Sequence, residues 1–146
     1  GAERHCFLPL KEVARSYFSD NARDTGGKVP MFTFEERVAM AEDALAEYAN
    51  VDVRGYSGLT VEHARKHGHQ VIIRGLRAVS DFEYEFQIAQ MNHNLKNEVE
   101  TLFMMTSVPY GYLSSSIVKE VASLKGPVES LVPPVVRQAL NEKFGG

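Results

Sequence analysis

Two arginines that flank a glycine and a leucine are the residues in this sequence best suited to hold a phosphate. Arg74, Gly75, Leu76 and Arg77 follow the apolar run at residues 71–73. A guanidinium group binds phosphate oxygens through two parallel hydrogen bonds, and a glycine lets a ligand approach the backbone closely. The pattern predicts a phosphate clamp, and a strand end with two solvated arginines is the alternative.

A glutamate further along the chain is a second candidate for ligand binding. Glu85 alternates with aromatic residues in the stretch Phe82-Glu83-Tyr84-Glu85-Phe86. Its carboxylate could accept hydrogen bonds from the sugar or the base of a nucleotide. A solvated helix face is the alternative interpretation of this stretch.

A run of hydroxyl side chains is the third candidate. It lies in Tyr110-Gly111-Tyr112-Leu113-Ser114-Ser115-Ser116. One serine suffices to cap a helix, whereas three hydroxyls beside free backbone N–H groups suit a phosphate. The two tyrosines could flank a base, and a plain serine-rich loop is the alternative.

The two histidines in His67-Gly68-His69 do not predict a catalytic or metal site. They lie between a predicted helix and the strand that follows it, away from the carboxyl end of that strand. No cysteine and histidine spacing is typical of zinc. The sequence therefore predicts no metal site built from protein side chains.

The elements that must position these residues alternate between helix and strand. Apolar residues recur at helical spacing after Thr33, and short apolar runs bounded by turn residues indicate strands. We expect helices over about 34–49, 59–68, 80–96, 114–124 and 133–144, and strands over about 51–54, 70–74 and 100–105.

Local signals mark the ends of these helices. Thr33 with Glu36, and Ser80 with Glu83, have the spacing of a capping box. Gly68 suits the left-handed position that ends a helix, and Pro133-Pro134 suits a helix start. Helices that alternate with strands predict a parallel sheet with crossovers, which binds ligands at the carboxyl ends of its strands.

The first thirty residues differ from the rest. Leu10, Val13, Ala14, Tyr17 and Phe18 have helical spacing, and a polar stretch over 19–27 follows them. We expect one amphipathic helix and then a loop, without an N-terminal strand.

Length and composition limit the classes of protein to which this sequence can belong. The 146 residues fit a single α/β domain over 1–146, with 1–27 atypical, and the net charge is -3. The sequence contains no run of Lys or Arg of the kind that predicts nucleic-acid binding. No apolar run approaches the roughly 20 residues that span a membrane. The single cysteine, Cys6, suits a reducing compartment, so we expect a cytoplasmic protein.

The strings that carry these candidates resemble a known family. The stretch from Ile73 through Arg-Gly-Leu-Arg to Phe-Glu-Tyr-Glu85 resembles the signature of bacterial phosphopantetheine adenylyltransferases. Further matches in order and spacing are Lys28-Val29-Pro30-Met31-Phe32-Thr33, Leu113-Ser114-Ser115-Ser116 and Val132-Pro133-Pro134. The resemblance covers roughly four fifths of the chain, from about Lys28 onward.

The resemblance implies a fold and a reaction. The fold is a Rossmann-like, doubly wound parallel sheet with flanking helices. The reaction joins ATP and 4'-phosphopantetheine, with Mg²⁺, into dephospho-coenzyme A and pyrophosphate. The resemblance also implies a homohexamer, with coenzyme A as a candidate feedback ligand.

The family resemblance also assigns roles to positions of this chain. Phosphopantetheine would face Lys28, Thr60 and Arg74, and ATP would contact Gly75, Leu76, Arg77, Glu85, Tyr110, Gly111, Tyr112, Leu113, Ser114, Ser115 and Ser116.

The resemblance assigns no catalytic histidine. The family carries Thr-Phe-Asp-Pro and Gly-His elements that bind ATP phosphates, and residues 1–27 contain neither. An alternative function is therefore a catalytically impaired homologue that binds coenzyme A or ATP without turnover. A sister nucleotidyltransferase for nicotinate mononucleotide or a cytidylyl acceptor is a further alternative, against which Lys28, Arg74 and the 82–85 string argue.

Overall fold

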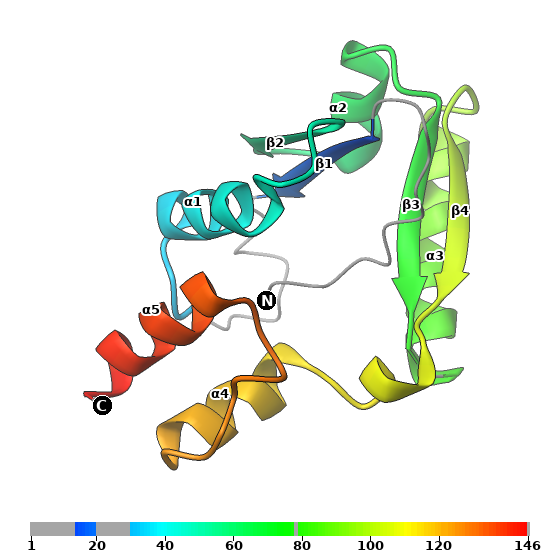
Figure 1. Ribbon diagram of the computed structural model, residues 1–146. Coiled ribbons are helices and arrows are strands. Elements are labelled where there is room, and N and C mark those ends of the chain that lie inside the picture. The colour runs from blue at the N-terminus through cyan, green and yellow to red at the C-terminus, as the bar shows by residue number, and fades with distance from the viewer. Residues whose placement is uncertain (1–13, 20–29, 78, 146) are drawn as a thin grey trace. The chain divides into compact units, whose positions relative to one another are not determined.

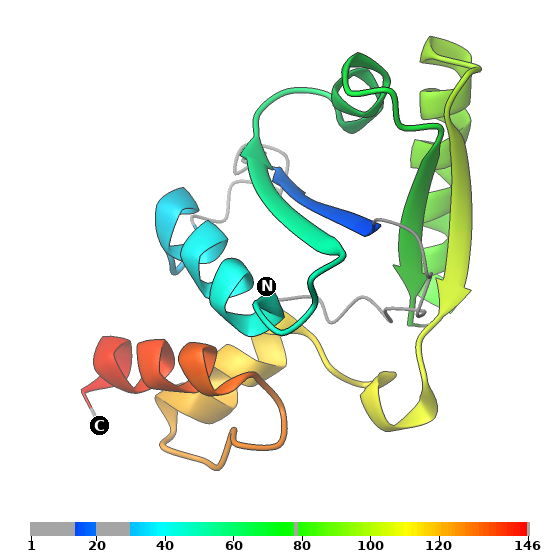
Figure 2. The same ribbon diagram turned by 45° about the horizontal axis from the view of Figure 1, so that its top comes forward.

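A computed structural model describes residues 14–19, 30–77 and 79–145 of the chain (Figures 1 and 2). Backbone contacts divide these residues into two compact units. The first consists of residues up to 55 together with those from 113 onward, and the second consists of residues 56–112. Each unit is described below by itself.

The first unit combines a strand pair with three helices. Strand β1 (Ala14–Ser19) pairs with β2 (Val51–Tyr56), of which Tyr56 belongs to the second unit. The helices are α1 (Phe34–Leu45), α4 (Ser115–Ser123) and α5 (Pro134–Phe144). Helix α5 packs against both α1 and α4.

The start of α1 shows how a local sequence signal becomes structure. The Thr33 backbone N–H donates to Glu36 Oε2 at 2.7 Å, and the Glu36 backbone N–H donates to Thr33 Oγ1 at 3.1 Å. This reciprocal pair satisfies two donors that a helix start otherwise leaves unpaired. Across the unit, Lys143 Nζ of α5 lies 3.5 Å from Glu36 Oε1.

The core of the first unit lies where α4 and α5 meet the loop between them. Five buried residues form it, and Leu140 of α5 is 2% exposed. Met31, Phe32 and Met40 from the α1 region also pack against it. The glycine at position 55 of β2 has a packing role, because the ring of Phe34 occupies the space that a Cβ would need.

The second unit contains the parallel strands that the sequence predicts. It holds α2 (Thr60–Lys66), β3 (Val71–Leu76), α3 (Val79–Leu95), β4 (Glu100–Met105) and a 3₁₀ turn, η1 (Val108–Tyr110). Strands β3 and β4 pair in parallel, with Arg74 opposite Phe103 and Leu76 opposite Met105. Helix α3 makes the crossover and packs against both strands, as Figure 1 shows.

A smaller core anchors α2 to β3. Val61 and Ala64 of α2 are buried with Val99, which precedes β4, and Ile72 packs against them. Gly68 takes a φ of 73°, so it ends α2 in the left-handed region as predicted.

Most predicted elements are confirmed. The α/β class with parallel strands and flanking helices is present, and β4 has the predicted bounds. The Thr33–Glu36 capping box, the Ser114 cap and the proline start of α5 are also confirmed. That the whole chain forms a single domain stays a prediction.

The predicted N-terminal helix is wrong where the structure describes it. Residues 14–19 form β1, so an N-terminal strand is present although the sequence pattern did not indicate one. A short stretch that contains tyrosine and phenylalanine has strand propensity as well as helical spacing, and pairing with β2 decides between them. The loop predicted over 19–27 lies outside the described residues, except for Ser19, which ends β1.

Two helix boundaries also differ from the prediction. Helix α3 begins at Val79, one residue before the predicted start at Ser80, and the predicted capping box of Ser80 with Glu83 stays a prediction. Helix α1 ends at Leu45 and not at residue 49, and the Ala46 N–H donates to Asp43 O at 3.3 Å, a bond that tightens the last turn. Among the described residues, no helix is both long and apolar enough to cross a membrane.

Truncation of the α5 core residue should destabilise the chain. We expect Leu140→Ala to lower the free energy of unfolding by about 2–5 kcal/mol, because it removes a leucine that is 2% exposed. Urea denaturation followed by circular dichroism measures the change. Leu124→Ala is the matched control, since Leu124 is 77% exposed. Equal losses in the two variants would contradict this placement of the core.

The capping box should make stability depend on acid pH. The hydrogen bond from the Thr33 backbone N–H, together with the nearby charge of Lys143, lowers the pKa of Glu36 below its ordinary value. A carboxyl whose pKa is lower in the folded state stabilises the fold above its unfolded-state pKa, and this contribution disappears as pH falls through the folded-state pKa.

We therefore expect Glu36→Ala to destabilise the protein at neutral pH and to differ less from the wild type in acid. Thermal unfolding at a series of pH values measures this. The adjacent Glu35→Ala removes an equal charge from the first turn and serves as the control. A Glu36→Ala effect that stays constant down to pH 3 would overturn the prediction.

Candidate functional site

The carboxyl ends of β3 and β4 lie at one edge of the second unit. The chain after β4 stays close to the chain after β3, because the Thr106 N–H donates to Leu76 O at 2.8 Å. Since the strands are parallel, this edge collects the residues that follow both of them. It is the edge at which the sequence analysis expects a ligand.

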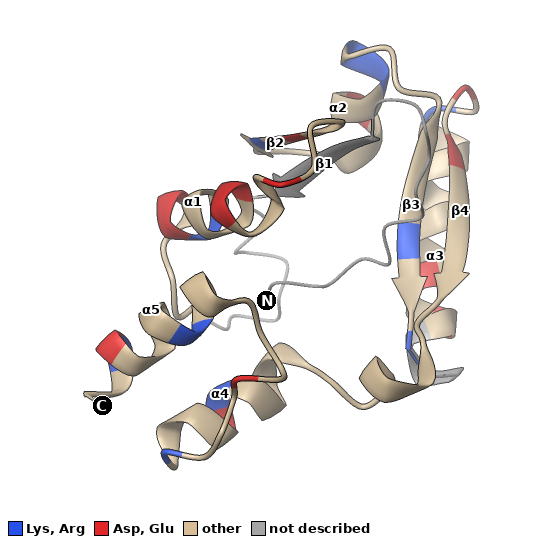
Figure 3. Cartoon of the chain, viewed as in Figure 1, with Lys and Arg blue, Asp and Glu red and all other residues tan. Residues whose placement is uncertain are grey.

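An ion pair joins β3 to α3 near this edge. Arg74 Nε donates to Glu85 Oε2 and Arg74 Nη2 donates to Glu85 Oε1, both at 2.8 Å. In Figure 3 the blue segment of β3 lies beside a red segment of α3. The side chains are 33% exposed for Arg74 and 14% exposed for Glu85. Fork-to-fork geometry of this kind is the strongest form of an arginine–carboxylate contact.

The turn after β3 brings further predicted residues together. A Cβ placed on Gly111 would lie 4.0 Å from the Arg77 carbonyl oxygen, so the backbones of these two residues run close together. A Cβ on Gly75 would come within 4 Å of one atom only, Thr106 Oγ1, at 3.9 Å. Gly75 therefore leaves room at the end of β3, as a ligand-binding glycine should.

The start of α3 adds a partial positive charge to this edge. The helix begins at Val79, three positions after β3 ends at Leu76. The N-terminus of a helix presents free N–H groups and a partial positive charge, which favour an anion. A phosphate at the end of β3 would meet this charge as well as the arginines.

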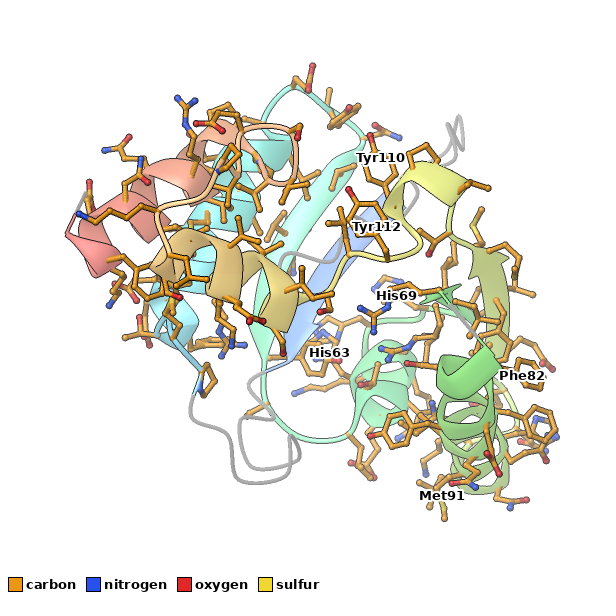
Figure 4. All side chains as sticks on the ribbon, turned by 90° about the horizontal axis from the view of Figure 1, so that it is seen from below. His63, His69, Phe82, Met91, Tyr110 and Tyr112 are labelled. Carbon is orange, nitrogen blue, oxygen red and sulfur yellow. The ribbon has the colours of Figure 1, made fainter. Side chains whose placement is uncertain are left out.

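The two tyrosines of the predicted ATP site follow β4. Tyr110 ends the 3₁₀ turn η1 and Tyr112 follows Gly111; they are 37% and 62% exposed. Figure 4 labels both on the segment after β4. Their exposure leaves the rings accessible to a base.

Thr60 is held by a neighbour that the sequence analysis missed. Tyr56 Oη donates to Thr60 Oγ1 at 2.7 Å, which orients the threonine hydroxyl at the first residue of α2. The only sequence signal for this contact is that Tyr56 lies four residues before Thr60. Thr106, which holds the chain after β4 against Leu76, was also missed.

The serine run belongs to the first unit. Ser114 is the N-cap of α4, since its Oγ accepts from the Ile117 N–H at 3.2 Å. Ser115 and Ser116 occupy the first turn of the helix, and Leu113 precedes the cap. Two hydroxyls beyond the cap therefore sit at a helix N-terminus, as the sequence analysis expects. Lys28 lies outside the described residues.

His67 and His69, which were rejected as catalytic or metal ligands from the sequence, continue a row of rings that begins at Tyr56 and His63. Tyr56 stacks on His63 and His63 contacts His67, each with ring centroids 4.2 Å apart, and His69 follows at 6.2 Å from His67. Figure 4 labels His63 and His69. Within the described part of the chain, no group of three or more His, Cys, Asp or Glu residues could hold a metal ion.

Comparison with known proteins gives one consistent answer. The family described as cytidylyltransferase-like matches residues 13–121. This match begins fifteen residues before the resemblance seen in the sequence analysis and includes β1.

Curated relatives from several bacteria carry the name phosphopantetheine adenylyltransferase. The protein from Geobacter sulfurreducens is 60% identical over 119 residues, which are 82% of this chain and 73% of that relative. The protein from Geotalea daltonii is 58% identical over 117 residues, 80% of this chain and 73% of its own length. The protein from Methylococcus capsulatus is 50% identical over 123 residues, 84% of this chain and 76% of its own length.

Proposed function

This chain belongs to the phosphopantetheine adenylyltransferase family, and we propose that it transfers the adenylyl group of ATP to 4'-phosphopantetheine in coenzyme A biosynthesis. An oxygen of the 4'-phosphate attacks the α-phosphorus of ATP in line. The bond from the α-phosphorus to the bridging oxygen breaks, pyrophosphate leaves, and dephospho-coenzyme A forms. The names of the relatives favour this enzyme over the binding-only alternative.

The observation that carries the proposal is an arginine held at the carboxyl edge of a parallel strand pair. Arg74 is fixed by Glu85 through two hydrogen bonds, beside a helix N-terminus and a glycine. We assign Arg74, Thr60 and Lys28 to phosphopantetheine. Arginine suits the 4'-phosphate because its planar donors match phosphate oxygens in pairs.

ATP would bind to the residues that the family resemblance assigns to it. We assign to it the turn at Gly75, Leu76 and Arg77 and the segment Tyr110, Gly111, Tyr112, Leu113, Ser114, Ser115 and Ser116, together with Glu85. The hydroxyls and N–H groups at the start of α4 suit phosphate oxygens, and the exposed tyrosine rings suit a base.

The reaction needs no nucleophile from the protein. Catalysis would consist of placing the two phosphates in line and stabilising the charge that develops on them. We propose that Mg²⁺ enters as part of the nucleotide substrate. The described residues hold no cluster of carboxylates and histidines for it, and Mg²⁺ commonly relies on substrate phosphates and water.

We also propose that the enzyme works in the cytoplasm as a homohexamer, with coenzyme A as a feedback ligand. The family resemblance suggests each of these. Helix α3 supports self-association, because Tyr84 and Met91 are each 58% exposed and Leu95 is 44% exposed. These residues share one helix face through spacings of seven and four, and Figure 4 shows Met91 projecting from the helix.

An assay of pyrophosphate release tests the proposed reaction. ATP, 4'-phosphopantetheine and Mg²⁺ together should yield pyrophosphate and dephospho-coenzyme A, and omission of either organic substrate should abolish both products. We expect Arg74→Ala to lower kcat/KM roughly 10- to 100-fold, because a charged hydrogen-bonding partner of the phosphate is lost.

A second arginine provides the matched control for this assay. Arg54 pairs with Asp52 at 2.8 Å in β2, in an exposed ion pair that the proposal assigns to no substrate. Arg54→Ala should leave kcat/KM within about twofold of the wild type. Absence of pyrophosphate from the wild-type chain would sink the proposed activity.

The oligomeric state is tested by mass in solution. Sedimentation equilibrium should give a mass about six times the 16.3 kDa of one chain. Met91→Lys places a charge on the exposed apolar face of α3 and should lower that mass. Leu124→Lys, at a residue that is 77% exposed on the first unit, is the control. A monomer at all concentrations would refute the hexamer.

A further inference from the structure

One hydrogen bond restrains the first turn of α2, the turn that carries Thr60. Tyr56 Oη donates to Thr60 Oγ1 at 2.7 Å. The N-cap of this helix is Leu59, an apolar residue whose side chain cannot accept a hydrogen bond. Helix starts are commonly held by an oxygen of a Ser, Thr, Asp or Asn side chain at that position. The tyrosine hydroxyl therefore provides a side-chain contact at a helix start whose own cap can give none.

The tyrosine is itself held by a row of rings along one face of α2. Its ring stacks on that of His63, with the centroids 4.2 Å apart and the planes inclined by 22°. The His63 ring contacts that of His67 at the same centroid distance, and His67 Nδ1 donates to the His63 carbonyl oxygen at 2.9 Å. Thr60, His63 and His67 share this face because they follow one another at intervals of three and four residues.

Another face of α2 is fixed in the core of the second unit. Val61 and Ala64 are buried, and they pack with Val99 and Ile72. The helix also packs against β3. Because the core holds the backbone of α2, the rings along its other face stand on a support that does not shift freely. The position of the Tyr56 hydroxyl is thus set by a packed helix.

We propose that Tyr56, backed by the His63 ring, is a positioning residue that orients Thr60 and the first turn of α2 for phosphopantetheine. The proposal rests on the proposed function, because it takes Thr60 as a contact of that substrate. A threonine hydroxyl both donates and accepts, so the hydrogen bond accepted from Tyr56 limits the directions in which it can donate. A group that is already oriented loses less freedom when its ligand binds. Tyr56 therefore acts on phosphopantetheine affinity, through Thr60, and not on ATP affinity.

The removal of a single oxygen atom tests the proposal. Tyr56→Phe keeps the ring that stacks on His63 but removes the hydroxyl that donates to Thr60. We expect this variant to weaken 4'-phosphopantetheine binding about two- to tenfold, as measured by calorimetry without ATP. The KM for ATP should stay within about twofold. Unchanged phosphopantetheine binding, or an equal rise in the KM for ATP, would overturn the proposal.

The matched control is Tyr48→Phe. Tyr48 lies in the first unit, three residues after the end of α1, and is 44% exposed. The substitution makes the same chemical change at a tyrosine to which the proposed function assigns no substrate. It should leave phosphopantetheine affinity unchanged. A loss equal to that of Tyr56→Phe would contradict a specific role for the Tyr56 hydroxyl.

A double-mutant cycle identifies the residue through which Tyr56 acts. Thr60→Val removes the threonine hydroxyl and keeps the shape of the side chain. In this background Tyr56→Phe should add no further loss of phosphopantetheine affinity, because the hydrogen bond is already absent. A loss that persists in the Thr60→Val background would show that Tyr56 acts by another route and would overturn the proposal.

A second pair of variants tests the ring that supports the tyrosine. His63→Ala removes the stacking partner of Tyr56, so it should also weaken phosphopantetheine binding about two- to tenfold. His63→Phe keeps a flat ring and should recover most of that loss. Wild-type affinity in His63→Ala would overturn the assignment of His63 as the support. If His63→Ala does not fold, Tyr56→Phe still decides the proposal, because it removes one atom and leaves the stack.

Failure of the proposed function has a different signature. A wild-type chain that releases no pyrophosphate from ATP and 4'-phosphopantetheine would sink the proposed reaction and the role of Tyr56 with it. A wild type that turns over normally, with Tyr56→Phe indistinguishable from it in phosphopantetheine affinity, would overturn the positioning role alone.

Discussion

The parallel pairing of β3 with β4 is the constraint on which the candidate site depends. Two parallel strands require the chain to cross back between them, and α3 makes that crossing. As a result the carboxyl ends of both strands and the N-terminus of α3 come to one edge. Arg74 and Glu85 meet because α3 packs against the strand that carries Arg74.

Features that depend on short-range chemistry could be predicted from the sequence. Strand β4 has the predicted bounds, since an apolar run bounded by polar residues needs no distant partner to be recognised. The Thr33–Glu36 box formed as expected because both hydrogen bonds lie within one helical turn. The arginine clamp, Glu85 and the serine run were found from residue types and spacing, whereas Lys28 and Thr60, and the substrate assigned to each residue, came only from the family resemblance.

Features that depend on distant partners were not predictable. Residues 14–19 have both helical spacing and strand propensity, and only the presence of β2 selects the strand. The Arg74–Glu85 contact joins side chains eleven residues apart on a strand and a helix. Sequence spacing does not give the distance between them, and the family resemblance assigns each of them to a separate substrate.

The ion pair bears on how a chain of net charge -3 would recognise the anionic substrates that we propose for it. A negative chain does not attract a phosphate through its overall field, so recognition must come from local donors. The Glu85 carboxylate compensates the charge of Arg74 and holds its planar donors in a defined direction. The specificity of such a site rests on the direction of its hydrogen bonds more than on accumulated positive charge. Direction is also what an in-line transfer between two phosphates demands, because the reacting atoms must be aligned and not merely attracted.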